Sequence, residues 1–227
     1  MVRPAANSVP TILFFCGRGT SRNDVAAIEE ILNDNRFSYA VVNSEHLNSM
    51  SEVQIRHYRL LVVPGGNFEE IGNGLEASTT ATIRHAVQGG LNYLGICAGA
   101  FLAGNSPYNG LNLTNGIRFT FYALESSGTR RAPVAITAAG SHTVDQYWED
   151  GPQLSGWGDI VAKYPDNTPA VVERSVEDGW VILAGIHPEA PESWRRGMSF
   201  TTPTSESNAY AATLIGAPLS RARLPHY

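Results

Sequence analysis

The first half of the chain alternates short apolar runs with segments in which apolar residues recur at helical spacing. Over residues 24–33, Ile28, Ile31 and Leu32 have the spacing of one helix face, and residues 78–88 show the same pattern. The apolar runs lie at residues 11–16, 37–42, 60–63 and 91–94. Near-continuous apolar strands separated by helices predict a parallel sheet buried on both faces, with ligands bound beyond the carboxyl ends of the strands.

The second half of the chain predicts more strands than helices. Residues 181–186 form another buried apolar strand, and a last helix is expected over 205–215, with Ser205 or Thr204 as its N-cap and Gly-Ala-Pro at 216–218 as its stop. Four other strands are expected at 119–124, 133–137, 159–164 and 170–174. The whole pattern predicts an α/β fold with a mostly parallel sheet and an antiparallel β excursion.

The composition fits a single domain over residues 1–227. With 43% apolar residues the chain can bury a sizeable core, and residues 1–9 and 218–227 are expected to be flexible tails. The net charge of −5 is mild and the basic residues are scattered, so no nucleic-acid partner is predicted.

The N-terminus and the apolar runs bear on where the protein is found. The first ten residues lack the apolar core of a signal peptide, and no apolar stretch approaches the roughly 20 residues that span a bilayer. We therefore expect a cytoplasmic protein with no membrane partner, and a homodimer as its oligomeric state. The two cysteines, Cys16 and Cys97, exclude a disulfide framework and leave one Cys16–Cys97 bridge open, with free thiols as the expectation.

Cys97 has the sequence setting of a nucleophile on a strand-to-helix turn. It follows an apolar run and lies between Gly95 and Gly99. Such a turn forces its central residue to positive φ and brings the flanking chain close, so small residues are needed two positions away on each side. The sulfur would lie at a helix N-terminus, where unpaired N–H groups favour the thiolate. Glycines also flank many buried cysteines in ordinary turns, so the motif gains its weight from residues elsewhere.

His187 and Glu189 follow directly after the strand expected at 181–186. Neighbouring parallel strands lie about 5 Å apart, so His187 can meet Cys97 at one edge of the sheet. A cysteine nucleophile needs a base, and the base needs a partner that fixes its tautomer; His187 and Glu189 have the residue types for these roles. Taken singly, each is equally typical of a structural residue at a strand end or a helix start.

Gly65 and Gly66 follow the strand at 60–63 and are candidates for stabilising the negative charge that develops on the substrate oxygen. Glycines let backbone N–H groups approach a developing oxyanion, and the amide of Ala98 would be the second donor. An ordinary strand-to-helix turn would use the same Pro-Gly-Gly sequence.

Three motifs in this order resemble the class I glutamine amidotransferase-like superfamily: Leu-Val-Val-Pro-Gly-Gly at 61–66, Gly-Ile-Cys-Ala-Gly-Ala at 95–100 and Ile-His-Pro-Glu at 186–189. Within it, residues 89–100 and the Gln-Tyr-Trp-Glu-Asp-Gly-Pro segment at 146–152 are similar to the N-terminal domain of eukaryotic biotin-protein ligases and to stand-alone bacterial relatives. The resemblance implies a flavodoxin-like three-layer sandwich. It also implies these roles: nucleophile Cys97, base His187, orienting residue Glu189, and oxyanion donors Gly65, Gly66 and Ala98.

Departures from the family pattern shape the expected function. Ala100 stands where glutamine amidotransferases usually carry a glutamine or a similar residue, and we expect neither an ammonia-consuming partner domain nor a biotin-ligase catalytic domain. The sequence therefore predicts a cysteine-nucleophile hydrolase or amidase-like enzyme that acts on a small-molecule or peptide-like amide or carbonyl substrate of unknown identity.

The expected enzyme uses no cofactor and no metal, because His142 and Asp145 alone are too few ligands for Zn²⁺. Tyr147 and Trp148 are expected to wall the substrate pocket. The alternative is a non-catalytic module that binds a small ligand or a protein on the same fold.

Overall fold

The computed structural model describes residues 10–140 and 143–227. The tail predicted at residues 1–9 lies outside this part of the chain.

Five parallel strands form the centre of the molecule, in the order β2-β1-β3-β4-β11. They are β1 (Ile12–Phe15), β2 (Tyr39–Val42), β3 (Leu60–Val63), β4 (Asn92–Ile96) and β11 (Gly179–Ala184). β1, β3 and β4 are buried along their whole length. Their side chains alternate between two cores, so that Ile12 and Phe14 face one and Leu13 and Phe15 face the other.

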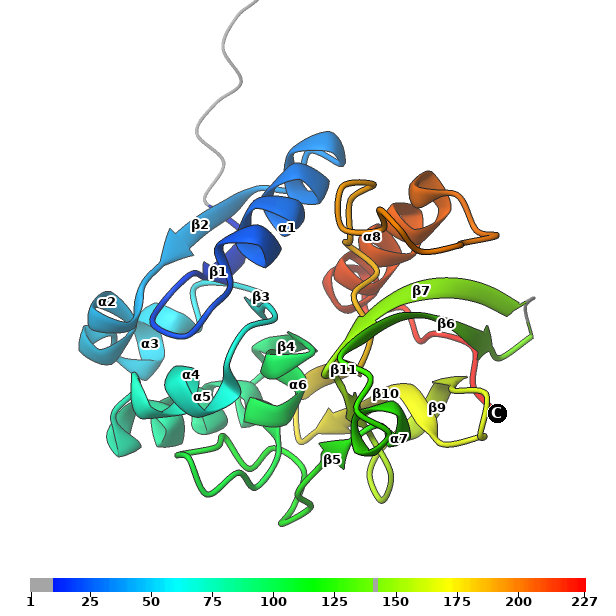
Figure 1. Ribbon diagram of the computed structural model, residues 1–227. Coiled ribbons are helices and arrows are strands. Elements are labelled where there is room, and N and C mark those ends of the chain that lie inside the picture. Colours follow the sequence, from blue (N-terminus) through cyan, green and yellow to red (C-terminus); the bar gives the residue numbers. More distant parts are fainter. Residues whose placement is uncertain (1–9, 141–142) are drawn as a thin grey trace, which may run out of the picture.

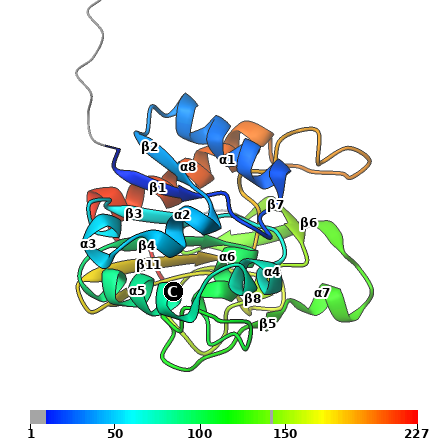
Figure 2. The same ribbon diagram turned by 90° about the vertical axis from the view of Figure 1, so that its left-hand side faces the viewer.

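Helices cover both faces of this sheet, which gives the predicted three-layer α/β sandwich (Figure 1). Figure 2 shows α1 (Arg22–Asp34) and α8 (Thr204–Ser220) on one face of the sheet, and α5 (Ala77–Gln88) and α6 (Ala98–Ala103) on the other. The second face also carries three short helices, α2 (Ser44–Ser49), α3 (Glu52–Ile55) and α4 (Phe68–Asn73). The expectation of an α/β fold with helices on both faces is confirmed.

Four antiparallel strands extend the sheet beyond β11. They are β10 (Pro169–Val176), β9 (Asp159–Lys163), β6 (Arg131–Ala138) and β7 (Thr143–Glu149), which together form the predicted antiparallel excursion. β7 was not among the predicted strands. Although it is farthest from β11 in strand order, Tyr147 forms an isolated bridge with His187, because β6 and β7 arch back over the sheet (Figure 1).

The strand predicted at 119–124 is shorter in the structure. Only β5 (Thr120–Phe121) is extended and pairs with β8 (Pro152–Gln153), and α7 (Ala123–Ser126) follows directly. The apolar residues at 119–124 therefore belong to a two-residue strand and the start of a short helix. The spacing of apolar residues did not distinguish these two elements from one longer strand.

The C-terminal helix is longer than predicted and begins differently. Pro203 is its N-cap and makes no side-chain cap hydrogen bond, and the helix continues through residues 216–218 to Ser220. Pro218 lies in the last turn and has no N–H to donate to the carbonyl four residues earlier, so the helix continues there without that bond. Asn92 donates to the Pro218 carbonyl at 2.9 Å, and Arg59 donates to the Leu219 carbonyl, so side chains satisfy the helix end.

Residues 218–227 are not the flexible tail that the sequence predicted. Leu224 is buried, and its amide donates to the buried Glu173 carboxylate at 3.0 Å. His226 contacts the same carboxylate at 2.8 Å, and the Tyr227 hydroxyl donates to the Thr137 carbonyl at 2.9 Å. Contacts with β10 and β6 therefore hold the segment in place. Among the described residues, no helix combines the length and the apolar character needed to cross a bilayer.

Candidate active site

Cys97 occupies a sharp turn between β4 and α6. Its φ of 48° and ψ of −104° match the positive φ that the sequence predicted. A Cβ on Gly95 would lie 2.5 Å from the Gly99 carbonyl oxygen, and a Cβ on Gly99 would lie 2.1 Å from the Val63 carbonyl oxygen. The turn therefore requires glycine at both flanking positions.

Strand pairing brings Cys97 and His187 to the same end of the sheet. β4 and β11 are parallel neighbours, with Ile96 opposite Ala184, and the Cys97 amide donates to the Ala184 carbonyl at 2.8 Å. His187 follows Ala184 by three residues, and both Cys97 and His187 line the same pocket. The Cys97 thiol donates to the Glu149 carbonyl at 3.5 Å, and the residue is 5% exposed.

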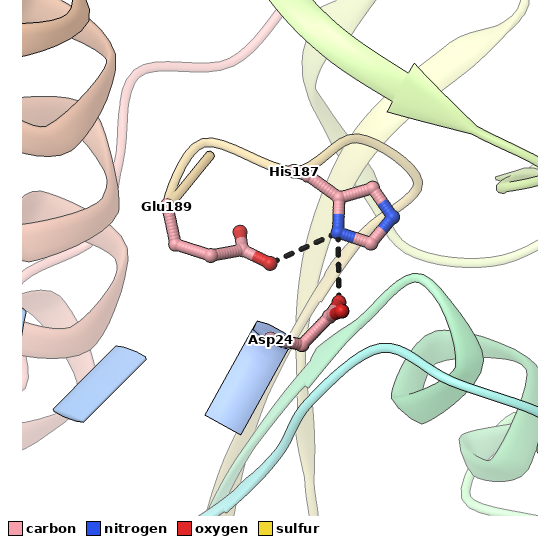
Figure 3. A group of neighbouring side chains, drawn as sticks. All are labelled: Asp24, His187 and Glu189. Carbon is pink, nitrogen blue, oxygen red and sulfur yellow. Dashed lines mark hydrogen bonds and ion pairs between the residues drawn. The ribbon is translucent and has the colours of Figure 1, made fainter. Parts of the chain in front are cut away.

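Two carboxylates hold one edge of the His187 ring (Figure 3). Nδ1 lies 2.9 Å from Glu189 Oε1 and 3.1 Å from Asp24 Oδ1, and all three residues are buried. Nε2 is on the other edge of the ring, is buried, and has no hydrogen-bond partner among the described residues. This arrangement fixes the tautomer at Nδ1 and leaves Nε2 available to accept a proton.

The charges of this cluster shift its ionisation. Burial by itself lowers the pKa of His187, but the negative charges of Cys97 and Glu189 and the hydrogen bond to Asp24 outweigh it and raise that pKa well above its usual value. Burial raises the pKa of Glu189, and the opposing effect of His187 is smaller. Burial also acts to raise the pKa of Asp24. The contact with His187, the Ser21 side chain and the backbone N–H of Asp24 outweigh burial, so this pKa is lowered. The Cys97 thiolate and the two carboxylates therefore stabilise the imidazolium that forms when His187 takes the Cys97 proton.

Asp24 is the site residue that sequence reasoning missed. It lies in the first turn of α1, where Ser21 caps the helix by accepting from the Asp24 amide at 3.3 Å. The turn after β1 lies at the same carboxyl edge of the sheet as Cys97 and His187, so an acid in the first turn of the helix there was the available signal. Gly65 is packed against it, because a Cβ on Gly65 would lie 2.0 Å from Asp24 Oδ1 and 2.7 Å from His187 Cε1.

The three predicted oxyanion donors occupy different positions. Ala98 is the first residue of α6, so its amide has no acceptor within the helix, and it lines the pocket. Gly66 also lines the pocket, with a φ of 143° in a tight loop where a Cβ would lie 2.2 Å from the Gly19 carbonyl oxygen. Gly65 is not among the lining residues; its carbonyl accepts from the Ser21 amide at 3.1 Å.

The pocket has a volume of about 810 Å³, and its lining residues come from both halves of the chain. Tyr147 lines it, and its hydroxyl donates to Glu149 Oε2 at 2.6 Å. The expectation for Trp148 was wrong: it is fully buried, donates to the Gly151 carbonyl at 3.2 Å, and belongs to the core on the other face of β7.

Asp24, His187 and Glu189 offer three potential metal-ligand atoms within 4.8 Å of one another. The 2.9 Å contact from Nδ1 to Glu189 Oε1 is a hydrogen bond and the 3.1 Å contact to Asp24 Oδ1 is an ion pair, so a proton on Nδ1 accounts for both distances. His142 lies outside the described residues. Cys16 and Cys97 are both free thiols, and the pKa of Cys16 is raised by burial and by the charge of Glu29.

Comparisons with known proteins agree with this fold. Residues 10–108 match the family model described as "Biotin-protein ligase, N terminal", which spans less than half of the 227 residues. No curated protein gave a match. Among solved structures, a glutamine amidotransferase is 19% identical, with a TM-score of 0.61 over 79% of this chain and 90% of the other.

Two other solved structures show how widely this fold is used. A glutamine amidotransferase from Thermotoga maritima is 13% identical, with a TM-score of 0.57 over 93% of this chain and 97% of its own. A β-galactosidase from the haloarchaeon Halorubrum lacusprofundi is 14% identical, with a TM-score of 0.54 over 95% of this chain but only 31% of its own. Likenesses at this identity establish the fold and leave the reaction to the site. The chain has a class I glutamine amidotransferase-like fold, and its residues 10–108 form a region like the N-terminal domain of biotin-protein ligase.

Proposed function

We propose that the protein is a cysteine hydrolase of the amidase type, in which Cys97 attacks a carbonyl carbon and His187 moves the proton. The observation that carries the proposal is the setting of His187, which lines the same pocket as Cys97: two buried carboxylates hold Nδ1, while Nε2 is buried and meets no hydrogen-bond partner among the described residues. A structural histidine would use both nitrogens for hydrogen bonds.

In the first step, the Cys97 thiol gives its proton to Nε2 of His187, and the sulfur forms a bond to the substrate carbonyl carbon. The carbonyl electron pair moves onto oxygen, and the amides of Ala98 and Gly66, two pocket-lining residues, are the donors that we expect to stabilise it. The C–N bond of the amide then breaks, and the proton on Nε2 goes to the leaving amine. An acyl thioester on Cys97 remains.

In the second step, a water molecule gives a proton to Nε2 of His187 and adds its oxygen to the thioester carbonyl. The C–S bond breaks, the carboxylic acid product leaves, and Cys97 regains its proton. Throughout, Glu189 and Asp24 stabilise the imidazolium form that His187 takes between proton transfers.

The test is trapping of the acyl thioester by intact-protein mass spectrometry, with a panel of amides and activated esters as substrates. We expect an acyl adduct on Cys97 and turnover that falls on the order of 10³-fold or more in Cys97→Ser. Cys16→Ser is the matched control and should retain both. If Cys97→Ser leaves turnover unchanged, or no substrate acylates Cys97, the hydrolase proposal fails and the binding-module alternative takes its place.

A further inference from the structure

Three phenylalanine rings form one wall of the candidate active-site pocket. Phe68 begins α4, Phe101 is on α6 and Phe121 is on β5, and all three line the pocket together with Cys97. Phe68 and Phe101 are stacked with centroids 4.6 Å apart, and Phe121 meets their edges at 6.2 and 5.0 Å. We call this set the phenylalanine wall.

The phenylalanine wall starts one helical turn from the nucleophile. The Phe101 amide donates to the Cys97 carbonyl at 3.2 Å, and residues four apart on a helix lie on the same face. A group bound against Phe101 would therefore be attached close to the carbonyl that Cys97 attacks.

Phe121 at the outer end of this wall is exposed to solvent without an obvious structural reason. It is 38% exposed and is one of only four large exposed apolar side chains in the described ranges 10–140 and 143–227. The other three, Val41, Val53 and Tyr227, do not line this pocket. An apolar ring left in water beside a nucleophile is a surface that a ligand can cover.

Two further aromatic side chains line the same pocket. Tyr147 and Trp194 line it with ring centroids 5.6 Å apart, and each lies 6.0 Å from the His187 ring. Aromatic rings pair favourably in stacked and edge-to-face geometries, and Phe121 already meets Phe68 and Phe101 at angles of 64° and 61°.

We infer that the phenylalanine wall binds an aromatic ring of the substrate, next to the carbonyl that Cys97 attacks. This inference rests on the proposed function, because it names the substrate class of the same site.

The test compares two alkylating probes that differ by one ring, 2-chloroacetamide and N-benzyl-2-chloroacetamide. In both, the Cys97 sulfur displaces chloride to form a thioether, and the thiol proton is released. For each thiol, the preference is the alkylation rate with the benzyl probe divided by the rate with 2-chloroacetamide. We expect this preference at Cys97 to exceed that of N-acetylcysteine by about 2- to 12-fold, the range for an aromatic pair. Phe121→Ala should remove this preference by lowering the rate with the benzyl probe.

Val53→Ala is the matched control, because Val53 is 69% exposed and outside the pocket. It should leave the preference unchanged. Any of three results overturns the inference: a preference at Cys97 equal to that of N-acetylcysteine, a preference that survives Phe121→Ala, or no alkylation of Cys97 by either probe. Because alkylation needs no turnover, a benzyl preference without amide hydrolysis would keep the aromatic site and reject the hydrolase.

Discussion

The packing of Gly65 against Asp24 and His187 gives a direct test of the site geometry. In Gly65→Ala, the added Cβ would lie 2.0 Å from Asp24 Oδ1 and 2.7 Å from His187 Cε1, well inside van der Waals contact. Neither neighbour can move away easily, because Nδ1 of His187 is held at 2.9 Å by the buried Glu189. The substitution therefore displaces the His187–carboxylate cluster or strains the loop after β3.

Overpacking of this kind costs about 1–3 kcal/mol of the free energy of unfolding. For a protein of this length each kcal/mol corresponds to roughly 2–4 °C, so the melting temperature should fall by roughly 2–12 °C. Thermal unfolding followed by circular dichroism measures it. Gly216→Ala is the matched control, because its Cβ meets only Phe37 at 3.8 Å within a helix, where alanine stabilises by about 0.5–1 kcal/mol relative to glycine.

A double-mutant cycle identifies the atom responsible. Asp24→Ala removes the carboxylate oxygen nearest to the new Cβ, so the cost of Gly65→Ala should be smaller in that background by about 0.5–3 kcal/mol. If Gly65→Ala melts at the wild-type temperature, or costs the same with and without Asp24, then Asp24 does not lie where the structure places it.

Other outcomes follow from the same contacts. Because folding raises the pKa of His187 above its unfolded value of about 6.5, the stability that it contributes is complete below that pH and is lost as pH rises through the folded pKa. Urea titrations should therefore show the gap between wild type and His187→Ala shrinking at alkaline pH; a gap that widens would contradict the sign. Asn92→Leu should cost about 1–3 kcal/mol by urea titration, since the Pro218 carbonyl and the Trp180 amide lose their partner, and an unchanged midpoint would refute this. Treatment with EDTA should leave the melting temperature unchanged if Nδ1 of His187 and its carboxylates share a proton; a fall would reveal a bound ion.

Much of the fold was predictable because its central strands are continuous apolar runs with helices between them. The meeting of Cys97 and His187 was predictable only as a strand-end argument, and the adjacency of β4 and β11 makes it possible. Asp24 escaped prediction because its contact with His187 joins two segments more than 160 residues apart, and local sequence marks it only as a helix-start acid.

The segment at 146–152 shows a different limit. Side chains alternate along a strand, so Tyr147 and Glu149 face the pocket while Trp148 faces the core. Local sequence does not decide which face each side chain takes, since β7 is defined by its long-range pairing with β6 and its bridge to His187. The end of α8 was missed for a similar reason, because the Asn92 and Arg59 side chains that satisfy it are distant in sequence.

The measurement that tests the central claim most directly is the rate of iodoacetamide alkylation at Cys97 in wild type and in His187→Ala. Peptide mass spectrometry reads Cys97 and Cys16 in one sample, and circular dichroism confirms that the variant is folded. Cys97 is 5% exposed and Cys16 is more accessible, so accessibility alone predicts faster reaction at Cys16. If Cys97 and His187 form a reactive pair, Cys97 should be alkylated faster than Cys16. In His187→Ala the rate at Cys97 should fall by about tenfold or more, while the rate at Cys16 stays the same. Faster alkylation of Cys16, or a Cys97 rate that does not depend on His187, would contradict the account.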